Sequence, residues 1–492
     1  MSNLRKNALL MVFYEILSLI VPLVLTPYIS RIIGAEGIGV YSYSYSIALY
    51  FVIVIQLGVK LYGRREIAKY NDNKAVYSKI FWSIFLLQVC IFLVVFPLYL
   101  YFFSQNTNQL MKSAFLIQSL ELIAGLLEIS WLFFGLEKFT VIVVRNTIVR
   151  LMEIILIFSF VSHSKDTLRY VLIMAFCNLL GAVSMWLNAG KYLSLVRLNY
   201  KDMKKHIGAL LILFIPVLST QLFAVIDKTI IGAVIDVTHV GYYENAYKIA
   251  KVPVVVITAL GNVMLPRITK LLADGEDKIA KEYIGKSMNL VMCVSAAISF
   301  GMCSVSKRFI LIYLGTSFQE SVELFSILSF IILFIGWGNV IRTQYMLPRG
   351  YDKLYTKSVV LGSILNIAIS FAFIKNLGAM GVAIGSVVSE FAISFYGSYK
   401  VKNELNLKKL LSSNMIYIVS GIAILGIVQC VDYLLKSSIN SSVLILILDI
   451  MIGGVAYVFL NITYELFTKK FVLLNEIKNV VEKFGLLKNG DI

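Results

Sequence analysis

Charged residues are scarce in this sequence. Asp, Glu, Lys and Arg make up 15% of its 492 residues and hydrophobic residues 59%, whereas soluble domains carry about 25% charged and roughly 45–50% apolar residues. A water-soluble globule cannot hide this excess of apolar side chains. A helix that crosses about 30 Å of hydrocarbon needs roughly 20 mostly apolar residues, and such stretches recur along the chain. We therefore predict an all-α, polytopic membrane protein.

Residues that carry enzyme chemistry are also few. The five cysteines lie in apolar runs without a C-x-x-C pair, which excludes a disulfide framework and a zinc site. The three histidines are scattered, and the D-x-D pair of metal-dependent sugar transferases is absent. Gly285-Lys286-Ser287 matches the end of a P-loop, but Ala280 replaces its first glycine. Nothing resembles a nucleophile elbow. We expect no enzymatic activity, no cofactor and no bound metal.

Hydropathy predicts about fourteen membrane spans. With a window of about 19 residues, apolar segments begin near residues 7, 38, 80, 111, 142, 168, 207, 241, 287, 321, 358, 380, 414 and 442. The fifth and eighth are the weakest because they carry several charges, so a count of twelve or thirteen stays open. Arg5 and Lys6 precede the first segment as in a signal peptide, but Glu15 interrupts it and no cleavage site follows. We expect a retained first helix.

The basic residues indicate the orientation of the chain. Most of the 45 Lys and Arg fall in alternate loops, and short basic loops stay on the cytoplasmic side. These loops are at 60–79, 191–205, 267–286, 349–357 and 400–409, with the tail from Lys469. The net charge of +17 therefore reflects membrane topology and does not indicate a nucleic-acid partner. We predict a multi-pass protein of the bacterial inner membrane with both termini in the cytoplasm.

A weak internal repeat divides the chain. Residues 32–34 (IIG), 39–41 (GVY) and 45–48 (YSIA) are echoed by 230–232 (IIG), 241–243 (GYY) and 247–250 (YKIA). An even number of predicted spans separates the copies, so they would enter the membrane in the same direction. We predict two six-helix lobes at 1–205 and 206–410, two additional helices at 411–464 and a basic cytoplasmic tail at 465–492. A shorter echo, Gly34–Gly37 against Gly378–Gly381, indicates tight outer turns where glycine tolerates a positive φ.

Several charges lie inside the predicted spans. A charge at the bilayer centre costs about 2.5–3.5 kcal/mol on insertion scales, so each requires an explanation. The spacing of Glu244, Lys248 and Lys251 places them on one helical face. The two lysines could bind one anion together, or Glu244 could pair with one lysine and leave the other for a ligand. Arg145 and Arg342 lie near cytoplasmic span ends and could merely extend toward the headgroups.

Other polar residues follow helical spacing as well. Lys228 could extend to the interface or pair with Asp227. Glu121 and Glu128 form a stripe in the fourth span that would face Arg150 of the fifth. A group of tyrosines at interfacial depth is typical of an aromatic belt, although stacking on sugars is an alternative; these are Tyr41, Tyr43, Tyr45, Tyr242 and Tyr243. Pro22 and Pro27 in the first span and Pro216 in the seventh predict bent helices around one cavity.

This layout resembles the O-antigen and capsule repeat-unit flippases of the multidrug/oligosaccharidyl-lipid/polysaccharide exporter superfamily. Residues 31–41 (RIIGAEGIGVY) look like that family's first outer turn and residues 227–232 (DKTIIG) like the end of its seventh span. The resemblance in arrangement covers nearly the whole chain. It implies a V-shaped pair of lobes, a central cationic cavity, alternating access and a polyprenyl-diphosphate-linked glycan as cargo.

The resemblance and the intramembrane charges together give candidate roles. The candidate substrate-binding residues are Arg31, Arg145, Arg150, Lys228, Lys248, Lys251 and Arg342, and the candidate counter-charges or ion-coupling residues are Glu15, Glu121, Glu128, Asp227 and Glu244. The expected partners are the lipid-linked glycan, membrane lipids, a sodium ion or proton, and polysaccharide polymerase and assembly proteins. Three alternatives stay open: a lipid II flippase, a cation-coupled multidrug exporter, and a membrane-embedded polysaccharide polymerase, which would normally carry a large outer loop.

Overall fold

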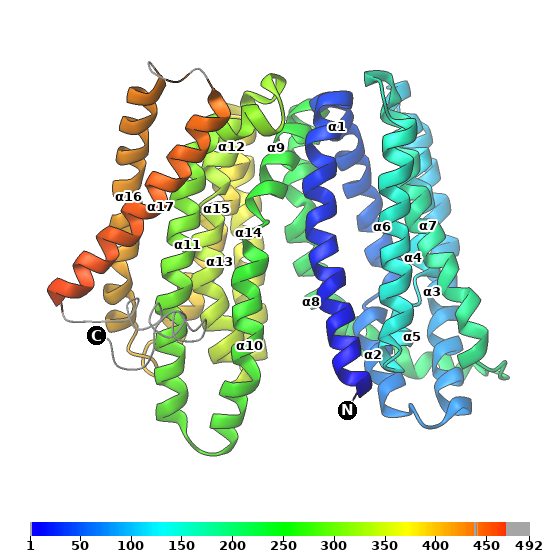
Figure 1. Cartoon of the computed structure of the whole chain (residues 1–492). Helices are drawn as coiled ribbons and strands as arrows, with labels where there is room; N and C mark the ends of the chain where they lie inside the picture. The colour runs from blue at the N-terminus through cyan, green and yellow to red at the C-terminus, as the bar shows by residue number, and fades with distance from the viewer. Residues whose placement is uncertain (1, 437–438, 440, 469–492) are drawn as a thin grey trace. The chain divides into compact units, whose positions relative to one another are not determined.

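The computed structural model consists of helices joined by short connections (Figure 1). It describes the backbone of residues 2–436, 439 and 441–468, and within these ranges the side chains from residue 20 onward except 215–216, 219–220, 222–224, 407–409, 436 and 468. The described residues contain no strand, which confirms the prediction of an all-α protein. The predicted basic tail from Lys469 lies outside the described residues, as does the side chain of Glu15.

The chain divides into two compact units, Met1–Glu244 (unit 1) and Asn245–Ile492 (unit 2). The helices that begin in unit 1 are α1 (Ser2–Gln56), α2 (Val59–Lys69), α3 (Lys74–Ser104), α4 (Gln109–Leu127), α5 (Ser130–Gly135), α6 (Phe139–Phe160), α7 (Thr167–Tyr192), α8 (Tyr200–Val234) and α9 (Val237–Ala250), which continues into unit 2. Helix α4 packs against both α1 and α7, and α6 packs against α7. Unit 1 therefore has α4 and α7 near its centre.

Unit 2 has a similar all-helical construction. Its helices are α10 (Val254–Ala273), α11 (Asp277–Tyr313), α12 (Glu320–Leu328), α13 (Ile331–Asn339), a π-helical turn (Val340–Met346), α14 (Asp352–Leu377), α15 (Ala379–Lys400), α16 (Leu407–Lys436) and α17 (Ser442–Thr468). Helices α14 and α15 form a closely packed hairpin, and α16 and α17 pack on α11.

Eleven of the described helical stretches are long and apolar enough to cross a membrane. The predicted count of fourteen is not tested by this criterion and stays a prediction. Helix α6 is long enough to cross a membrane at 22 residues, but it is not among these eleven because it contains three charged residues, Arg145, Arg150 and Glu153. A criterion of length and hydropathy misses a helix whose charged side chains form ion pairs inside the protein.

Glycine conformation bears out the two predicted turns at Gly34 and Gly378, whose position on the outer side stays a prediction. Helix α1 is interrupted at Gly34, whose backbone has φ 67° and ψ −173°, and Gly378 joins α14 to α15 with φ 58° and ψ −140°. Backbone angles of this kind are almost restricted to glycine, because a Cβ would collide with neighbouring backbone atoms. The echo between residues 34–37 and 378–381 thus marks two turns with the same backbone requirement.

The predicted eighth span is broken. The spacing of Glu244, Lys248 and Lys251 indicated one helical face, but α9 ends at Ala250 and Lys251 lies in the turn that precedes α10. Pro253 explains the break, because proline lacks a backbone N–H and pushes the residue before it out of the helical conformation. The predicted span is therefore interrupted directly after Ala250. The Lys251 N–H still donates to the Tyr247 carbonyl oxygen at 3.0 Å, as in a helix, so the shared face of the two lysines stays a prediction.

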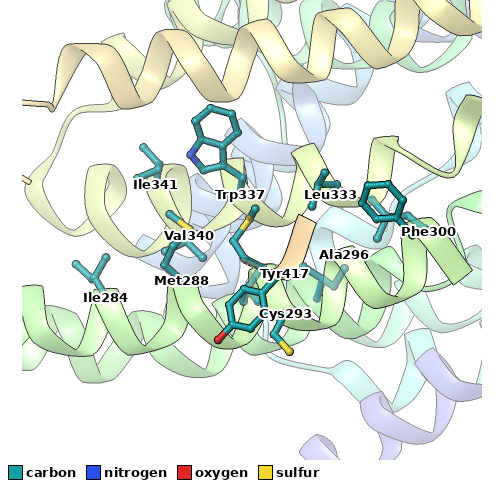
Figure 2. Packing of buried hydrophobic residues seen from close by; sticks show 14 of the residues in the cluster. Ile284, Met288, Cys293, Ala296, Phe300, Leu333, Trp337, Val340, Ile341 and Tyr417 are labelled. Carbon is teal, nitrogen blue, oxygen red and sulfur yellow. The ribbon is translucent and has the colours of Figure 1, made fainter. Parts of the chain in front are cut away.

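The core of unit 2 is formed by α11, α13, the π-helical turn and α16. Figure 2 shows Met288 and Phe300 of α11 facing the helix that carries Leu333 and Trp337, with Tyr417 of α16 beside them. These side chains are almost completely buried. Ion pairs add a second attachment, because Arg308 of α11 contacts Asp432 and lies 3.8 Å from Asp449. Helices α16 and α17 are thus held on α11 by apolar contacts and by charge.

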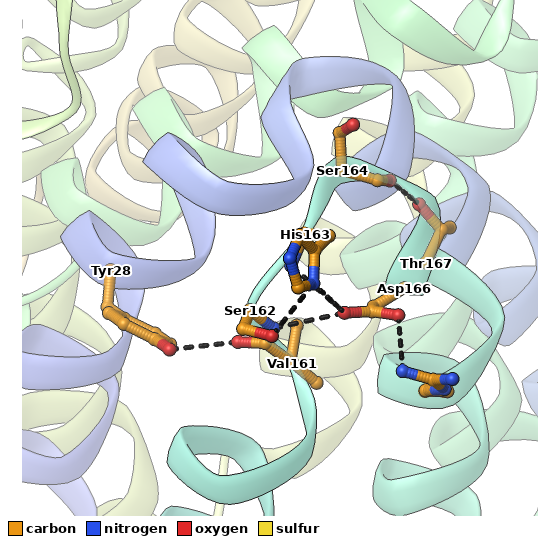
Figure 3. Close-up of polar contacts among 8 residues, drawn as sticks. Tyr28, Val161, Ser162, His163, Ser164, Asp166 and Thr167 are labelled. Atoms are coloured by element: carbon orange, nitrogen blue, oxygen red, sulfur yellow. Dashed lines mark hydrogen bonds and ion pairs between the residues drawn. The ribbon is translucent and has the colours of Figure 1, made fainter.

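A polar turn connects α6 to α7 in unit 1 (Figure 3). Asp166 accepts hydrogen bonds from the backbone N–H groups of Ser162 (3.1 Å) and His163 (2.9 Å). The Tyr28 hydroxyl of α1 donates to the carbonyl oxygen of Val161 at 2.8 Å. Free backbone groups at helix ends need such partners, so this turn fixes the end of α6 relative to α1.

Candidate functional site in unit 1

A polar pocket of about 510 Å³ lies in unit 1. It is lined by α1, α2, α4, α6, α7 and α8 through Tyr45, Leu49, Val52, Ile53, Gln56, Gly58, Val59, Lys60, Leu61, Glu121, Ala124, Gly125, Glu128, Arg145, Asn178, Ala182, Val217 and Gln221. Ligand pockets typically enclose about 300–1,000 Å³ and contain a few placed polar groups. This pocket has two acids, two bases, three carboxamides and a phenol within a strongly apolar helical unit.

The break between α4 and α5 positions one ion pair of the pocket. Helix α4 ends at Leu127, and Glu128 turns its side chain to accept a 2.9 Å hydrogen bond from the backbone N–H of Ser130. The other carboxylate oxygen of Glu128 lies 3.3 Å from the Arg145 guanidinium of α6. The acid therefore caps the N-terminus of α5, where negative charge is favoured, and neutralises the arginine.

The last turn of α4 leaves backbone carbonyls that the helix itself cannot satisfy. Gln56 of α1 donates from Nε2 to the Gly125 carbonyl oxygen at 3.4 Å. Trp186 of α7 donates from Nε1 to the Leu127 carbonyl oxygen at 2.9 Å. A helix that ends within a membrane is tolerated only when neighbouring side chains supply such partners, and one of these two partners, Gln56, also lines the pocket.

Glu121 is the most deeply placed acid of the pocket. Its residue is 8% exposed, and Oε1 accepts a 2.8 Å hydrogen bond from Nδ2 of Asn178 in α7. This bond joins α4 to α7 across 57 positions of sequence. The carboxylate and the carboxamide together offer a hydrogen-bonding edge to the pocket.

Neighbouring polar residues extend the site along α1, α6 and α7. Arg150 pairs with the buried Glu153 at 2.6 Å. The rings of Tyr41 and Tyr45 stack with centroids 5.7 Å apart, and Tyr170 meets Tyr41 edge-on at 5.1 Å. The predicted pairing of the fourth and fifth spans through charge is found at Glu128 and Arg145. Arg150 instead pairs within its own helix.

A second group of charges lies where α8 meets the beginning of α9. The Lys228 ammonium is 3.1 Å from the Glu244 carboxylate, and the Tyr243 hydroxyl donates to Asp227 at 2.6 Å. The sequence left open whether Lys228 extends to the interface or pairs with Asp227. The structure gives Lys228 an acidic partner, but this partner is Glu244.

The remaining predicted site residues are distributed over both units. Lys248 is exposed on α9, and Lys251 lies over the Tyr247 ring with its ammonium 4.4 Å from the ring centroid. Arg342 of the π-helical turn is 4.0 Å from Glu390 of α15. Arg31 is an exposed residue near the end of the first part of α1. Roles in substrate binding or ion coupling stay predictions for all of these residues.

Three polar pocket residues were missed by sequence reasoning: Gln56, Lys60 and Asn178. Two are uncharged carboxamides, and a search for intramembrane charges does not select them. Lys60 was assigned to a cytoplasmic loop because of the charges that follow it. The only available signal was an isolated carboxamide in an apolar run, as at Asn178, since such a group requires a hydrogen-bonding partner in the membrane.

Two family models match long segments of the chain. The family described as polysaccharide biosynthesis protein matches residues 4–272, and the family described as lipid II flippase MurJ matches residues 171–453. Each match covers more than half of the 492 residues. The two matches overlap and together extend over both units.

Similar proteins agree with these matches. A protein of Escherichia coli (strain K12) named as an O-antigen transporter is 23% identical over 80% of this chain and 95% of its own length. A protein of the same description from Shigella dysenteriae is 21% identical over 81% of this chain and 100% of its own length. A Haloferax volcanii protein named as a low-salt glycan biosynthesis flippase is 20% identical over 34% of this chain and 35% of its own length.

Solved structures show the same fold. The inward closed conformation of lipid II flippase MurJ superposes with a TM-score of 0.70 at 15% identity, covering 94% of this chain and 100% of the other. The inward-facing conformation of a multidrug resistance transporter, described as a member of the MOP superfamily, gives a TM-score of 0.53 at 14% identity, covering 76% of this chain and 94% of the other. The chain therefore belongs to the polysaccharide biosynthesis protein family, and it also matches the lipid II flippase family over more than half of its length.

Proposed function

We propose that this protein moves a polyprenyl-diphosphate-linked oligosaccharide from the inner to the outer leaflet of a bacterial cytoplasmic membrane, for assembly of a surface polysaccharide, by alternating access. The observation that carries the proposal is the polar pocket inside the apolar helices of unit 1, with Lys60, Glu121, Glu128 and Arg145 in its lining. Charges at membrane depth normally mark a path for polar cargo. The relatives named as O-antigen transporters support the choice of cargo.

The chemistry of the cargo fits these residues. A diphosphate requires cationic donors in a medium of low dielectric constant, and Arg and Lys supply charge-assisted hydrogen bonds to it. Arg150, Lys248 and Lys251 are the residues that we propose to hold the diphosphate, with Arg145 and Lys60 contributing in the pocket. The lipid tail can stay in the bilayer throughout. Outward movement of negative charge also follows an inside-negative potential, which contributes about 2.3 kcal/mol per charge per 100 mV.

The acids would serve as counter-charges or ion-coupling groups. We propose Glu121 and Glu128 in the pocket, with Asp227, Glu244 and Glu15, as the residues through which a sodium ion or a proton is coupled to transport. Glu128 already neutralises Arg145, so binding of an anion to this arginine would have to compete with the carboxylate. No covalent step is required, and the translocation proceeds without a soluble catalytic centre.

A second candidate cargo is lipid II. The match of the lipid II flippase family to residues 171–453 favours it, and its diphosphate-linked structure would place the same demands on the cationic residues. The two cargoes differ in their sugars and peptide, so only direct comparison of substrates separates them.

The central experiment combines deletion with reconstitution. In a strain that lacks other flippases, deletion of the gene should cause the lipid-linked repeat unit to accumulate on the cytoplasmic leaflet. Purified protein in proteoliposomes should restore its movement, and Arg145→Ala should reduce the rate at least tenfold. Arg169→Ala is the matched control, because the Arg169 side chain is 66% exposed and forms a local ion pair with Asp166. Unchanged surface polysaccharide after deletion would contradict the proposal.

Orientation needs its own test. We propose that both termini lie in the cytoplasm, on the basis of the basic loops. A fluorescent protein that folds only in the cytoplasm, fused after Ile492, should be bright, and alkaline phosphatase fused at the same position should be inactive. The reverse pattern would invert the topology.

A further inference from the structure

Three residues from three helices share the lining of the unit 1 pocket: Tyr45 of α1, Glu121 of α4 and Asn178 of α7. Glu121 accepts a 2.8 Å hydrogen bond from Asn178. The ion pair of the pocket, between Glu128 and Arg145, does not involve these residues.

Glu121 retains hydrogen-bonding capacity toward the pocket. A carboxylate offers about four lone-pair sites, and the side-chain bond recorded for Glu121 among the described residues uses one of them, on Oε1. Asn178 retains a carbonyl oxygen and a second N–H, since its amide has two donors. A carboxylate beside a carboxamide thus presents both acceptors and a donor. Adjacent hydroxyl groups of a sugar ring, each of which is both donor and acceptor, complement this edge.

Tyr45 supplies an apolar surface next to that edge. Its ring is partly exposed and stacks on Tyr41, which Tyr170 contacts from the side. This arrangement restrains the Tyr45 ring. The face of an aromatic ring is electrostatically negative, so it attracts the weakly positive C–H groups on one side of a sugar ring. A phosphate has no such apolar side and would gain nothing from the face of the Tyr45 ring.

Charge indicates which sugars would fit. Arg145 is neutralised by Glu128 at 3.3 Å, whereas the recorded partner of Glu121 is the uncharged Asn178. Of the nearby cations, Arg150 pairs with Glu153 at 2.6 Å and Lys60 lies beside Glu128. The side chains that act on Glu121 itself are the uncharged Asn178 and the acidic Glu153, so its immediate surroundings are negative or neutral. An acidic sugar would place a second carboxylate near Glu121 in a medium where like charges repel strongly. A neutral or N-acetylated sugar avoids that repulsion.

From this geometry we propose that Tyr45, Glu121 and Asn178 form a subsite for an uncharged sugar residue of the cargo, separate from the cations that bind its diphosphate. The proposal rests on the proposed function, because it assigns to one part of the pocket the glycan of a lipid-linked diphosphate. It gives the pocket a role in selecting sugars and not only in carrying charge.

Binding to the purified full-length protein in nanodiscs tests the proposal. The probes are a short-chain polyprenyl diphosphate, the same lipid carrying N-acetylglucosamine, and the same lipid carrying glucuronic acid. The wild-type protein should bind the N-acetylglucosamine probe at least tenfold more tightly than the other two. Glu121→Gln and Tyr45→Leu should each remove about tenfold or more of that preference, the size expected when a charge-assisted hydrogen bond or an aromatic contact is lost.

The variants are chosen to separate recognition from folding. Gln at position 121 can still accept from Asn178, so the link between α4 and α7 is kept while the charge is removed. Glu66→Gln makes the same chemical change at a surface ion pair with Lys69 and should leave all three affinities unchanged. Binding of the sugar-free diphosphate by Glu121→Gln and Tyr45→Leu should equal that of the wild type.

Three outcomes would overturn the proposal. Equal wild-type affinity for the sugar-free and N-acetylglucosamine probes would show that no sugar subsite exists. Preserved preference in both variants would place the subsite elsewhere. Equal loss of all probes in the variants would indicate a structural role for these residues. Failure of the wild type to bind any diphosphate probe would instead contradict the proposed function itself.

Discussion

Gly39 of α1 and Gly241 of α9 lie backbone against backbone in unit 1. A methyl group at Gly39 would lie 3.1 Å from the Gly241 nitrogen and 1.6 Å from the Val237 carbonyl oxygen, and one at Gly241 would lie 1.9 Å from the Ala35 carbonyl oxygen. These two glycines occupy matching positions in the internal repeat. The two copies of the repeat therefore contact one another through their shared glycine, where no other residue fits.

Alanine at either of these glycines should force the helices apart. We expect Gly39→Ala and Gly241→Ala to destabilise the protein by about 1–3 kcal/mol or more, the range for overpacked contacts, and to lower its melting temperature in detergent. Gly208→Ala is the control, because a methyl group there has nothing within 4 Å. That helical substitution should be neutral or slightly stabilising. Equal melting temperatures for all three variants would contradict the close contact.

Gly34 allows a test of local backbone strain, because a side chain there would not contact other parts of the chain. A methyl group at Gly34 meets nothing within 4 Å, but its φ of 67° and ψ of −173° suit glycine almost alone. We expect Gly34→Ala to cost about 1–3 kcal/mol. Gly350→Asn should cost less, because φ 72° and ψ 23° form a left-handed conformation that Asn adopts. Thermal denaturation of the two variants compares them, and a larger loss for Gly350→Asn would contradict the conformational argument.

Variants of the ion pair between Arg145 and Glu128 distinguish a role in stability from a role in transport. Their side chains are 16% and 17% exposed, so removal of one partner leaves a largely desolvated charge. We expect Arg145→Met and Glu128→Gln each to destabilise the protein by about 1–3 kcal/mol, below the about 3–5 kcal/mol of fully buried pairs. The double variant should recover much of that stability but not transport. A double variant that transports at the wild-type rate would show that Arg145 is not required for cargo.

Acid should weaken the beginning of α8. Burial together with Lys205 lowers the pKa of His206 to about 4 from its ordinary 6.5, although Glu66 and Asp202 oppose the shift. The unfolded chain therefore binds a proton at a higher pH than the folded protein does. The stabilising contribution of neutral His206 is complete above pH 6.5 and is lost as the pH falls toward 4.

Substitution of His206 tests whether this residue causes the predicted loss of stability in acid. In the structure Tyr62 Oη lies 2.7 Å from His206 Nδ1, so Asn at this position can keep an acceptor for the tyrosine without titrating. Melting temperatures between pH 4 and 7 should fall less steeply with acid for His206→Asn than for the wild type. Identical slopes would show that acid destabilises the protein through other groups.

Much of the candidate site was not accessible to sequence reasoning. Glu121, Glu128 and Arg145 were predicted because charges are rare within apolar runs, and all three line the pocket. Gln56 and Asn178 carry no charge, and nothing in their local sequence connects them with α4. Lys60 lies at the boundary between an apolar run and a basic loop, where retention in the cytoplasm explains it equally well.

The sequence by itself determined the all-helical membrane class, the internal repeat, and the glycine turns at Gly34 and Gly378. These features depend on apolar length and on local backbone conformation, which neighbouring residues fix. Only the tertiary structure decided which charges meet, such as Lys228 with Glu244 and Arg145 with Glu128. Each of these pairs joins different helices, and helical spacing places a side chain on a face without saying which helix that face will meet.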